Sequence, residues 1–217
     1  MIERPGAARW VHEGEDDIAR LREAAQSCRG CELYLEATQA VMGEGPADAR
    51  LMVLGEQPGD KEDLAGEPFV GPAGRLLDQA LEDAGIAAQS VFRTNVVKHF
   101  RFSGTRGKQR IHKSPSTVHV AACGPWLVAE LAAVRPQGVV VLGATAGKAL
   151  YGPQFRVGAD RGQLLDWPVR RSGEHAPRWV LPTTHPSAVL RSRTRAEDLL
   201  ALVADLKVAA AALDGAA

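Results

Sequence analysis

Apolar residues recur along this chain in short runs that alternate with stripes at helical spacing. Four runs have the length and composition of buried strands, at residues 50–56, 90–100, 137–142 and 178–183. Helical spacing marks residues 16–31, 74–86, 114–136 and 194–215, and a shorter helix follows the third strand. Strands that alternate with helices favour a parallel sheet with both faces covered. We therefore expect an α/β fold with three layers, α/β/α, around a central, mostly parallel four-stranded sheet.

Local signals set the ends of several of these helices. Ser114 or Ser116 can cap the third helix, in which Pro125 should cause a kink or a restart. Thr194 and Glu197 have the spacing of a capping box at the start of the last helix. Residues 57–74 are so rich in Gly, Pro and acids that they predict a loop, and we expect residues 101–113 to form a long loop as well.

Composition limits the kind of protein this can be. The chain has 217 residues, of which 45% are hydrophobic and 24% charged, and this favours a single domain over residues 1–217. No stretch approaches the roughly 18 to 20 apolar residues that cross a bilayer, so we expect a soluble, cytoplasmic protein that contacts no membrane. Nothing in the sequence indicates an obligate dimer, and a monomer is expected.

The charges are balanced overall but not locally. The chain carries 26 basic and 26 acidic residues, yet residues 98–113, KHFRFSGTRGKQRIHK, contain six cations, a histidine at each end of the run and no acid. Such a segment favours an anionic partner and predicts binding that weakens with salt. If the partner is a nucleic acid, it would meet a local basic surface, and the protein would be associated with the nucleoid.

Polar residues follow the ends of the predicted strands. The segments GEQPG, TNVVK, GATAG and THPS stand there, and the carboxyl ends of parallel strands share one rim of a sheet. Glu56, Asn95 and His185 should therefore meet. Taken one at a time, each has a plain structural explanation: GEQPG is a turn, Asn95 bridges loops and His185 satisfies a nearby backbone group. GATAGKA is one residue short of a phosphate-binding loop and lacks its Ser or Thr, so we interpret it as a tight strand-to-helix turn.

The three cysteines are too few for a disulfide scaffold. Cys28 and Cys31 are spaced to share a metal, Cys123 lies far away in the sequence, and His99 is a candidate fourth ligand. Spacing alone leaves zinc, iron-sulfur and unligated buried cysteines open.

In order along the chain, GEQPGDKEDLAGEPFVGPAG, TNVVK, ACGPWL, VVVLGATA and PTTHPSAVLR resemble the iron-sulfur uracil-DNA glycosylases, from about Cys28 to Arg191. The inserted GKQRIHKSP is similar to the loop of the UdgX branch, whose members cross-link covalently to uracil-DNA. The resemblance implies the same fold and a role in DNA repair.

It also implies roles for single residues. Gly55 and Gln57 would wall the uracil pocket, Phe69 would stack on the flipped base, Asn95 would read its Watson–Crick edge and His185 would bond its O2. The family places its main acid just after the glycine of this motif, where this chain has Glu56, which would lie at the reacting sugar. A carboxylate there and a donor at the base suit an oxocarbenium-like transition state.

The opening of the DNA and its covalent capture are implied in the same way. His112 would attack the sugar in place of water, so that the enzyme reacts once and remains attached. Val189, Leu190 and Arg191 would form the wedge into the base stack. The remaining DNA contacts would come from Lys98, Arg106, Lys108, Arg110, Lys113 and Ser187. Single-stranded DNA is the expected substrate, with duplex DNA also open.

A 4Fe-4S cluster is the cofactor that the resemblance implies, held by Cys28, Cys31, His99 and Cys123. Most of the family has cysteine where this chain has His99, although histidine can ligate iron-sulfur irons. Two other functions stay open at this point: a conventional glycosylase that releases uracil and leaves an abasic site, and a metal-stabilised nucleic-acid-binding module without catalysis.

Overall fold

The computed structural model describes residues 6–12, 15–168 and 176–215. Four parallel strands form the centre of its main sheet: β1 (Leu51–Gly55), β2 (Val91–Asn95), β5 (Gly138–Leu142) and β7 (Trp179–Thr183). The strand order is β2-β1-β5-β7-β6. The two-residue strand β6 (Leu165–Asp166) pairs antiparallel with β7 at the edge of the sheet. The parallel core of four strands confirms the predicted sheet, and β6 is an addition to it. The ends of the predicted domain, residues 1–5 and 216–217, lie outside the described residues.

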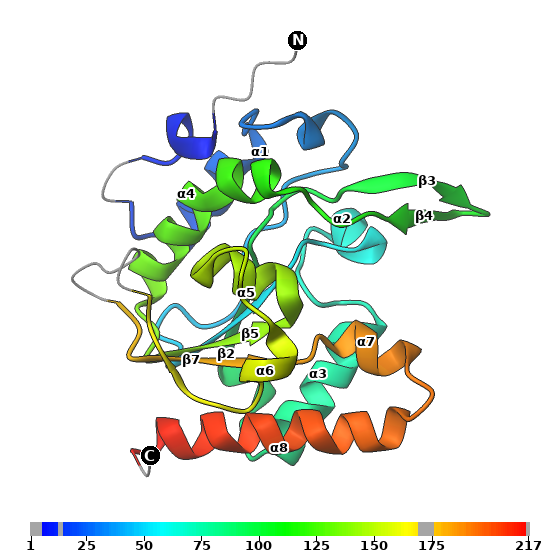
Figure 1. Ribbon diagram of the computed structural model, residues 1–217. Helices are drawn as coiled ribbons and strands as arrows, with labels where there is room; N and C mark the ends of the chain where they lie inside the picture. The colour runs from blue at the N-terminus through cyan, green and yellow to red at the C-terminus, as the bar shows by residue number, and fades with distance from the viewer. Residues whose placement is uncertain (1–5, 13–14, 169–175, 216–217) are drawn as a thin grey trace.

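Helices cover both faces of the sheet, and this confirms the three layers (Figure 1). One layer holds α1 (Ile18–Gln26), α4 (Thr117–Val134) and α5 (Gly143–Tyr151), and the other holds α3 (Pro72–Asp83), α7 (Pro186–Arg191) and α8 (Arg195–Leu213). Strand β1 shows why: Met52 and Leu54 pack with the first layer, whereas Leu51 and Val53 pack with the second. The shorter elements are α2 (Asp60–Ala65), α6 (Val157–Asp160) and the 3₁₀ helices Ala7–Arg9, Glu32–Leu35 and Ala88–Ser90.

Two expected loops contain regular structure. Helix α2 forms within residues 57–74, since Asp60, Glu62 and Asp63 fill its first turn, where carboxylates favour a helix, and Gly66 ends it at φ 80°. The basic segment is the hairpin β3 (Phe102–Arg106) and β4 (Gln109–His112), with Gly107 at φ 62° in its turn. The polar segment after β7 starts helix α7.

The predicted helix ends were partly right. Ser116 is the N-cap of α4, and its N–H donates to His119 Nδ1 at 3.0 Å. Helix α4 continues through Pro125. The Thr194/Glu197 capping box is wrong, because the Thr194 hydroxyl instead donates to Asp198 Oδ2 at 3.4 Å.

By length and hydropathy, α4 is also the one helix in the described part of the chain that could cross a bilayer. It packs against α1 and α5, and it carries the buried residues Trp126 and Glu130. These are the properties of a core helix in a globular fold.

Candidate active site at the carboxyl ends of the strands

The carboxyl ends of all four parallel strands carry the residues that the sequence singled out. Gly55 ends β1 and pairs with Asn95, the last residue of β2. Gly143 follows β5 at φ 83°, and a Cβ added there would come within 3.1 Å of the His185 Cβ, which follows β7. The parallel register thus unites segments that lie up to 130 residues apart in sequence (Gly55 to His185).

Gly55 lets two of these side chains approach the strand end. A Cβ on Gly55 would lie 2.4 Å from Asn95 Oδ1 and 2.8 Å from Phe69 Cζ. Asn95 and Phe69 are both buried, with 3% and 8% of their surface exposed. Phe69 has φ 60°, a conformation that costs free energy in a bulky residue and is held here by its surroundings. The structure therefore fixes a planar ring beside an amide at the end of the sheet.

Glu56 lies next to these residues and contacts two other segments. Its Oε2 accepts a hydrogen bond from Thr145 Oγ1 at 2.5 Å, and its Oε1 lies 3.5 Å from Nε2 of His112. We refer to Glu56, Phe69, Asn95, His112 and His185 as the strand-end cluster. Thr145 was missed from the sequence, because GATAG was interpreted only as a turn. A hydroxyl residue three positions after the end of β5, at the same rim, was the available signal.

Both histidines of the strand-end cluster favour the neutral form. Burial is the largest cause that lowers the pKa of His185 to about 4, and the nearby Arg191 and His112 contribute to the same shift. Burial also lowers the pKa of His112, where Glu56 acts to raise the pKa and Arg191 to lower it. Nδ1 of His185 accepts a hydrogen bond from the Ser187 N–H at 3.1 Å, so the ring proton sits on Nε2. His185 thus satisfies a nearby backbone group, the Ser187 N–H, as its structural explanation predicted. It also offers a neutral N–H donor to a ligand.

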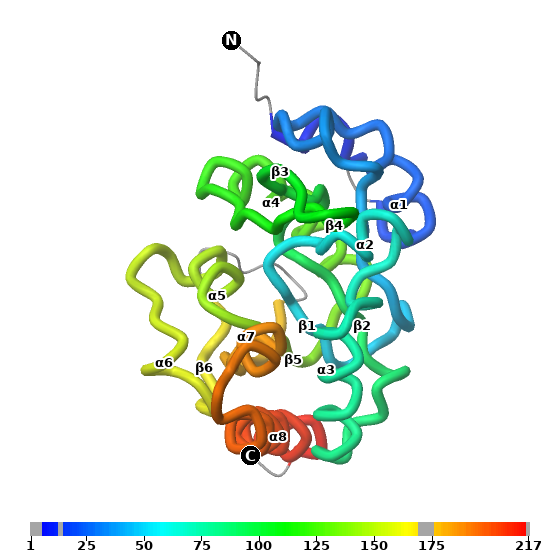
Figure 2. Tube along the Cα trace, turned by 90° about the vertical axis from the view of Figure 1, so that its right-hand side faces the viewer, coloured from blue at the N-terminus to red at the C-terminus, as the bar shows by residue number. Residues whose placement is uncertain are grey.

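The hairpin that carries His112 is fastened to the site by Gln57. Gln57 Nε2 donates to the carbonyls of Arg101 at 3.0 Å and Lys113 at 3.2 Å, and Gln57 Oε1 accepts from the Arg101 N–H. The side chain of Gln57 therefore bridges the two ends of the hairpin and uses both of its amide protons there. Figure 2 shows β4 beside α2, with which it is in contact.

Arg110 fastens the hairpin to α2 and is not a free cation. Its guanidinium pairs with Asp60 at 2.5 Å and with Asp63 at 2.8 Å, and it lies over the rings of Phe100 and Phe102. Two carboxylates neutralise its single charge. The expected phosphate contact of Arg110 is therefore wrong, because the guanidinium is committed to α2.

Lys98 is also wrong as a DNA contact. It is fully buried, and its Nζ donates to Glu130 Oε2, Thr94 Oγ1 and the Asn95 carbonyl, each at 2.7 Å. All three ammonium protons are therefore used inside the protein. Through the bond from Lys98 to its carbonyl, the network holds the main chain of Asn95 in place.

Exposed cations and polar groups remain on the hairpin and on α7. Arg106, Lys108 and Lys113 are exposed, as is Arg191 at the end of α7. Ser187 and Leu190 are partly exposed, whereas Val189 is fully buried. Val189 thus cannot enter a base stack, and the expected wedge is reduced to Leu190 and Arg191.

The expected metal ligands lie in three segments of the chain, after α1, after β2 and within α4. Cys28, Cys31, His99 and Cys123 are all buried, and the three cysteines belong to one core cluster. Two N–H groups donate to sulfur: Lys98 N to Cys123 at 3.2 Å and Trp126 Nε1 to Cys28 at 3.4 Å. Burial lowers the pKa of His99 to about 4, so its imidazole is neutral, and raises the pKa of Cys123 to about 12.

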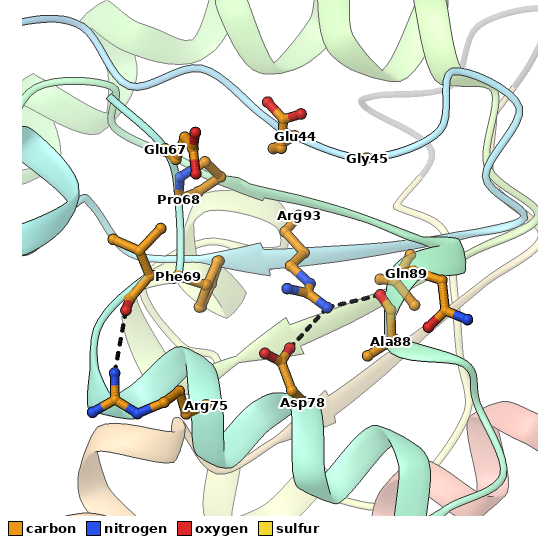
Figure 3. Close-up of a pocket in the computed structure, with 12 residues that line it drawn as sticks. Glu44, Gly45, Glu67, Pro68, Phe69, Arg75, Asp78, Ala88, Gln89 and Arg93 are labelled. Carbon is orange, nitrogen blue, oxygen red and sulfur yellow. Dashed lines mark hydrogen bonds and ion pairs between the residues drawn. The ribbon is translucent and has the colours of Figure 1, made fainter. Parts of the chain in front are cut away.

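A separate cavity of about 480 Å³ lies beside β2 and α3, and Phe69 is the residue it shares with the strand-end cluster. Figure 3 shows the carboxylates of Glu44, Glu67 and Asp78 around it, with Arg93 bonded to Asp78 and to the Ala88 carbonyl. Three carboxylates and two arginines, Arg75 and Arg93, line this cavity, so it has no excess of positive charge that would favour a polyanion.

Comparison with known proteins agrees with this geometry. The family model described as the uracil DNA glycosylase superfamily matches residues 42–207, which include every residue of the strand-end cluster. The chain is similar to the type-4 uracil-DNA glycosylase of Thermotoga maritima, with 36% identity over 85% of this chain and 88% of that protein. Type-4 uracil-DNA glycosylases of Pyrobaculum aerophilum (34%; 81% and 85%) and Archaeoglobus fulgidus (36%; 82% and 84%) are similar over comparable shares. The chain therefore belongs to the uracil-DNA glycosylase superfamily.

Proposed function

We propose that this protein excises uracil from DNA in repair and remains covalently attached to the abasic sugar through His112. The excision is supported by family membership and by the relatives, which are named for this activity. The covalent step is carried by one observation: the ring of His112, whose pKa is lowered by burial, lies 3.5 Å from the one carboxylate of the strand-end cluster. A nucleophile and the group that stabilises the reacting sugar cation are thus adjacent.

Base recognition follows from the planar groups of the strand-end cluster. A flipped uracil costs a few kcal/mol of stacking and pairing, which stacking on Phe69 and hydrogen bonds to Asn95 offset. The amide of Asn95 carries a donor and an acceptor side by side, which matches the O4 and N3–H edge of uracil. Because Gly55 has no side chain, Phe69 and Asn95 can approach the strand end where the base would lie. The main chain at Gln57 completes the wall of this uracil pocket.

Bond cleavage separates two opposite charges. The C1′–N1 bond breaks with its electron pair on uracil, and the Nε2–H of His185 stabilises that anion, mainly at O2. The Glu56 carboxylate stabilises the oxocarbenium sugar. Uracil then leaves after taking a proton from solvent.

Capture of the sugar uses the lone pair of His112. The unprotonated ring nitrogen forms a bond to C1′, and the resulting imidazolium loses the proton of its other nitrogen to solvent, to which the side chain is 48% exposed. No water is consumed and no hydroxyl reaches C1′, so each protein molecule reacts once. In the alternative, a conventional glycosylase, Glu56 orients water to the same carbon.

DNA contacts in this proposal come from the exposed groups. Arg106, Lys108 and Lys113 on the hairpin, with Arg191 on α7, bind phosphates, and Ser187 adds a polar contact. Leu190 enters the base stack. A monomer that accepts single-stranded DNA suffices, since one chain supplies all of these groups.

A 4Fe-4S cluster fits the residues around Cys123. Among the described residues, no three His, Cys, Asp or Glu side chains are close enough to hold one metal ion, which disfavours a single zinc. Cys28, Cys31, His99 and Cys123 would hold such a cluster, whose protein ligands can stand further apart than the ligands of a single metal ion. The N–H···S bonds to Cys28 and Cys123 suit sulfurs that carry negative charge. Such a cluster would supply structural cross-linking of three segments.

The decisive experiment is a denaturing gel after incubation with a labelled uracil-containing single-stranded oligonucleotide, with a thymine oligonucleotide as control. A uracil-dependent band at the summed mass of protein and DNA supports the covalent proposal. Free DNA with an alkali-labile site supports the conventional glycosylase instead. Intact DNA would leave a binding module and end both enzymatic proposals.

A further inference from the structure

Helix α5 meets the strand-end cluster through Thr145. Thr145 lies in the first turn of α5, directly after β5, and its hydroxyl donates to Oε2 of Glu56 at 2.5 Å. The contact joins residues 89 positions apart. A hydroxyl bonded to a carboxylate is a charge-assisted contact, which is stronger and more directional than a bond between neutral groups.

This bond leaves the second oxygen of Glu56 for the reaction. Oε1 is buried and accepts no hydrogen bond in the described part of the protein, and it faces Nε2 of His112 at 3.5 Å. A carboxylate anchored at one oxygen cannot rotate freely about its last torsion. Thr145 therefore determines which oxygen faces His112 and the space where the sugar carbon must sit.

The support for Thr145 is itself rigid. Helix α5 packs against β1 and β5, and Ala146 and Leu150 are buried in the core below it. The turn that starts the helix also touches His185, because a Cβ on Gly143 would lie 3.1 Å from the His185 Cβ. One segment thus sets the distance between the carboxylate and the histidine donor, and a rigid element aligns reacting groups better than a loop does.

We propose that Thr145 is a positioning residue for the reaction at the strand ends, aligning the Glu56 carboxylate with His112 and the sugar. The proposal rests on the proposed function, and it concerns the rate of the reaction rather than the binding of DNA. Thr145 touches no substrate in this scheme and acts through Glu56.

Two substitutions separate the hydroxyl from the shape of the side chain. Thr145→Val keeps the volume and removes the donor, while Thr145→Ser keeps the donor and removes the methyl group. Single-turnover adduct formation is measured against protein concentration with the uracil oligonucleotide. We expect Thr145→Val to lower the maximal rate roughly 10- to 100-fold with half-saturation unchanged, as the loss of a hydrogen bond to a charged group implies. Thr145→Ser should stay within about threefold of the wild type, since its bond to Glu56 remains.

A pH profile gives a readout that general destabilisation would not move. The charged or titratable groups that face His112 are Glu56, Arg191 and His185. Glu56 raises the pKa of His112, so a carboxylate that swings away in Thr145→Val lets that pKa fall. Because the neutral ring reacts, the acidic limb of the rate profile then moves to lower pH, and Thr145→Ser leaves it in place.

The results that overturn the proposal are distinct from those that overturn the function. A Thr145→Val protein with wild-type rate and profile refutes it, and so does a Thr145→Ser protein as slow as Thr145→Val. If the wild type neither excises uracil nor cross-links, the proposed function fails. NMR titration of the His112 ring in wild type and Thr145→Val then still decides the positioning, because an unchanged pKa refutes it and a lowered one supports it.

Discussion

The buried pair of Lys98 and Glu130 allows a direct test of whether Lys98 is a core residue, as in the structure, or a DNA contact, as the sequence predicted. Both side chains are 1% exposed, and their charged atoms lie 2.7 Å apart. The substitution Lys98→Met keeps the length of the side chain and removes the charge. Glu130 then retains two donors, the Gly43 N–H and the Thr94 hydroxyl, each at 2.7 Å, but no positive partner.

The magnitude follows from leaving a carboxylate buried without its cation. Removing one partner of a buried pair costs about 3–5 kcal/mol of the free energy of unfolding. For a chain of 150 to 250 residues, each kcal/mol shifts the midpoint of thermal unfolding by about 2–4 °C. Lys98→Met should therefore lower the midpoint by roughly 6–20 °C. Adding Glu130→Gln to Lys98→Met removes the unpaired charge and should recover part of the loss.

The assay combines thermal unfolding with DNA binding at several salt concentrations. Lys98→Met should leave the dependence of affinity on salt unchanged, because its ammonium group is fully buried and reaches no phosphate. Lys113→Ala, which removes an exposed cation, is the matched control and should reduce the slope by about one. A midpoint drop below about 2 °C, or a salt slope reduced as far as in Lys113→Ala, would refute the assignment of Lys98 to the interior.

Three further predictions concern the reaction and the cofactor. His112→Ala should abolish the cross-link and admit water, so that the same oligonucleotide becomes alkali-labile; a variant that still cross-links excludes His112 as the nucleophile. The rate of adduct formation by the wild type should hold as pH falls through 6.5, because the pKa of His112 is lowered and its ring stays neutral there; a midpoint at or above 6.5 contradicts the role of burial. Purified protein should be brown with absorbance near about 400 nm, as expected of iron-sulfur centres, and should bleach when iron is chelated; a colourless protein loaded with zinc contradicts the cluster.

The cations of residues 98–113 do not form one surface, because the fold places them in different environments. Six cations between Lys98 and Lys113 looked like one surface, yet they belong to two kinds of structure. Lys98 follows the end of β2 and turns into the core toward α4, whereas Arg106, Lys108 and Lys113 lie on the exposed hairpin. Arg110 has the same sequence environment as its neighbours but meets Asp60 and Asp63 of α2. Charge along the chain does not report which carboxylates the fold brings near it.

The sequence by itself determined the layers and the rim of the candidate site. Apolar runs such as residues 51–54 and 138–142 can only be buried, and helical stripes between them force parallel strands, whose ends must share one edge. Gly55, Asn95 and His185 could be placed there because they directly follow or end those strands. Composition and order suffice for such contacts, since the geometry of a parallel sheet is regular.

Only the tertiary structure decided which side chains pair across that edge. The bonds from Thr145 to Glu56, from Gln57 to both ends of the hairpin and from Lys98 to Glu130 span 89, 44 to 56 and 32 residues. Each depends on the direction in which a side chain points, and no pattern of polar and apolar positions encodes that direction. Local sequence thus fixed where the reacting groups gather, and packing between distant elements fixed which of them face one another.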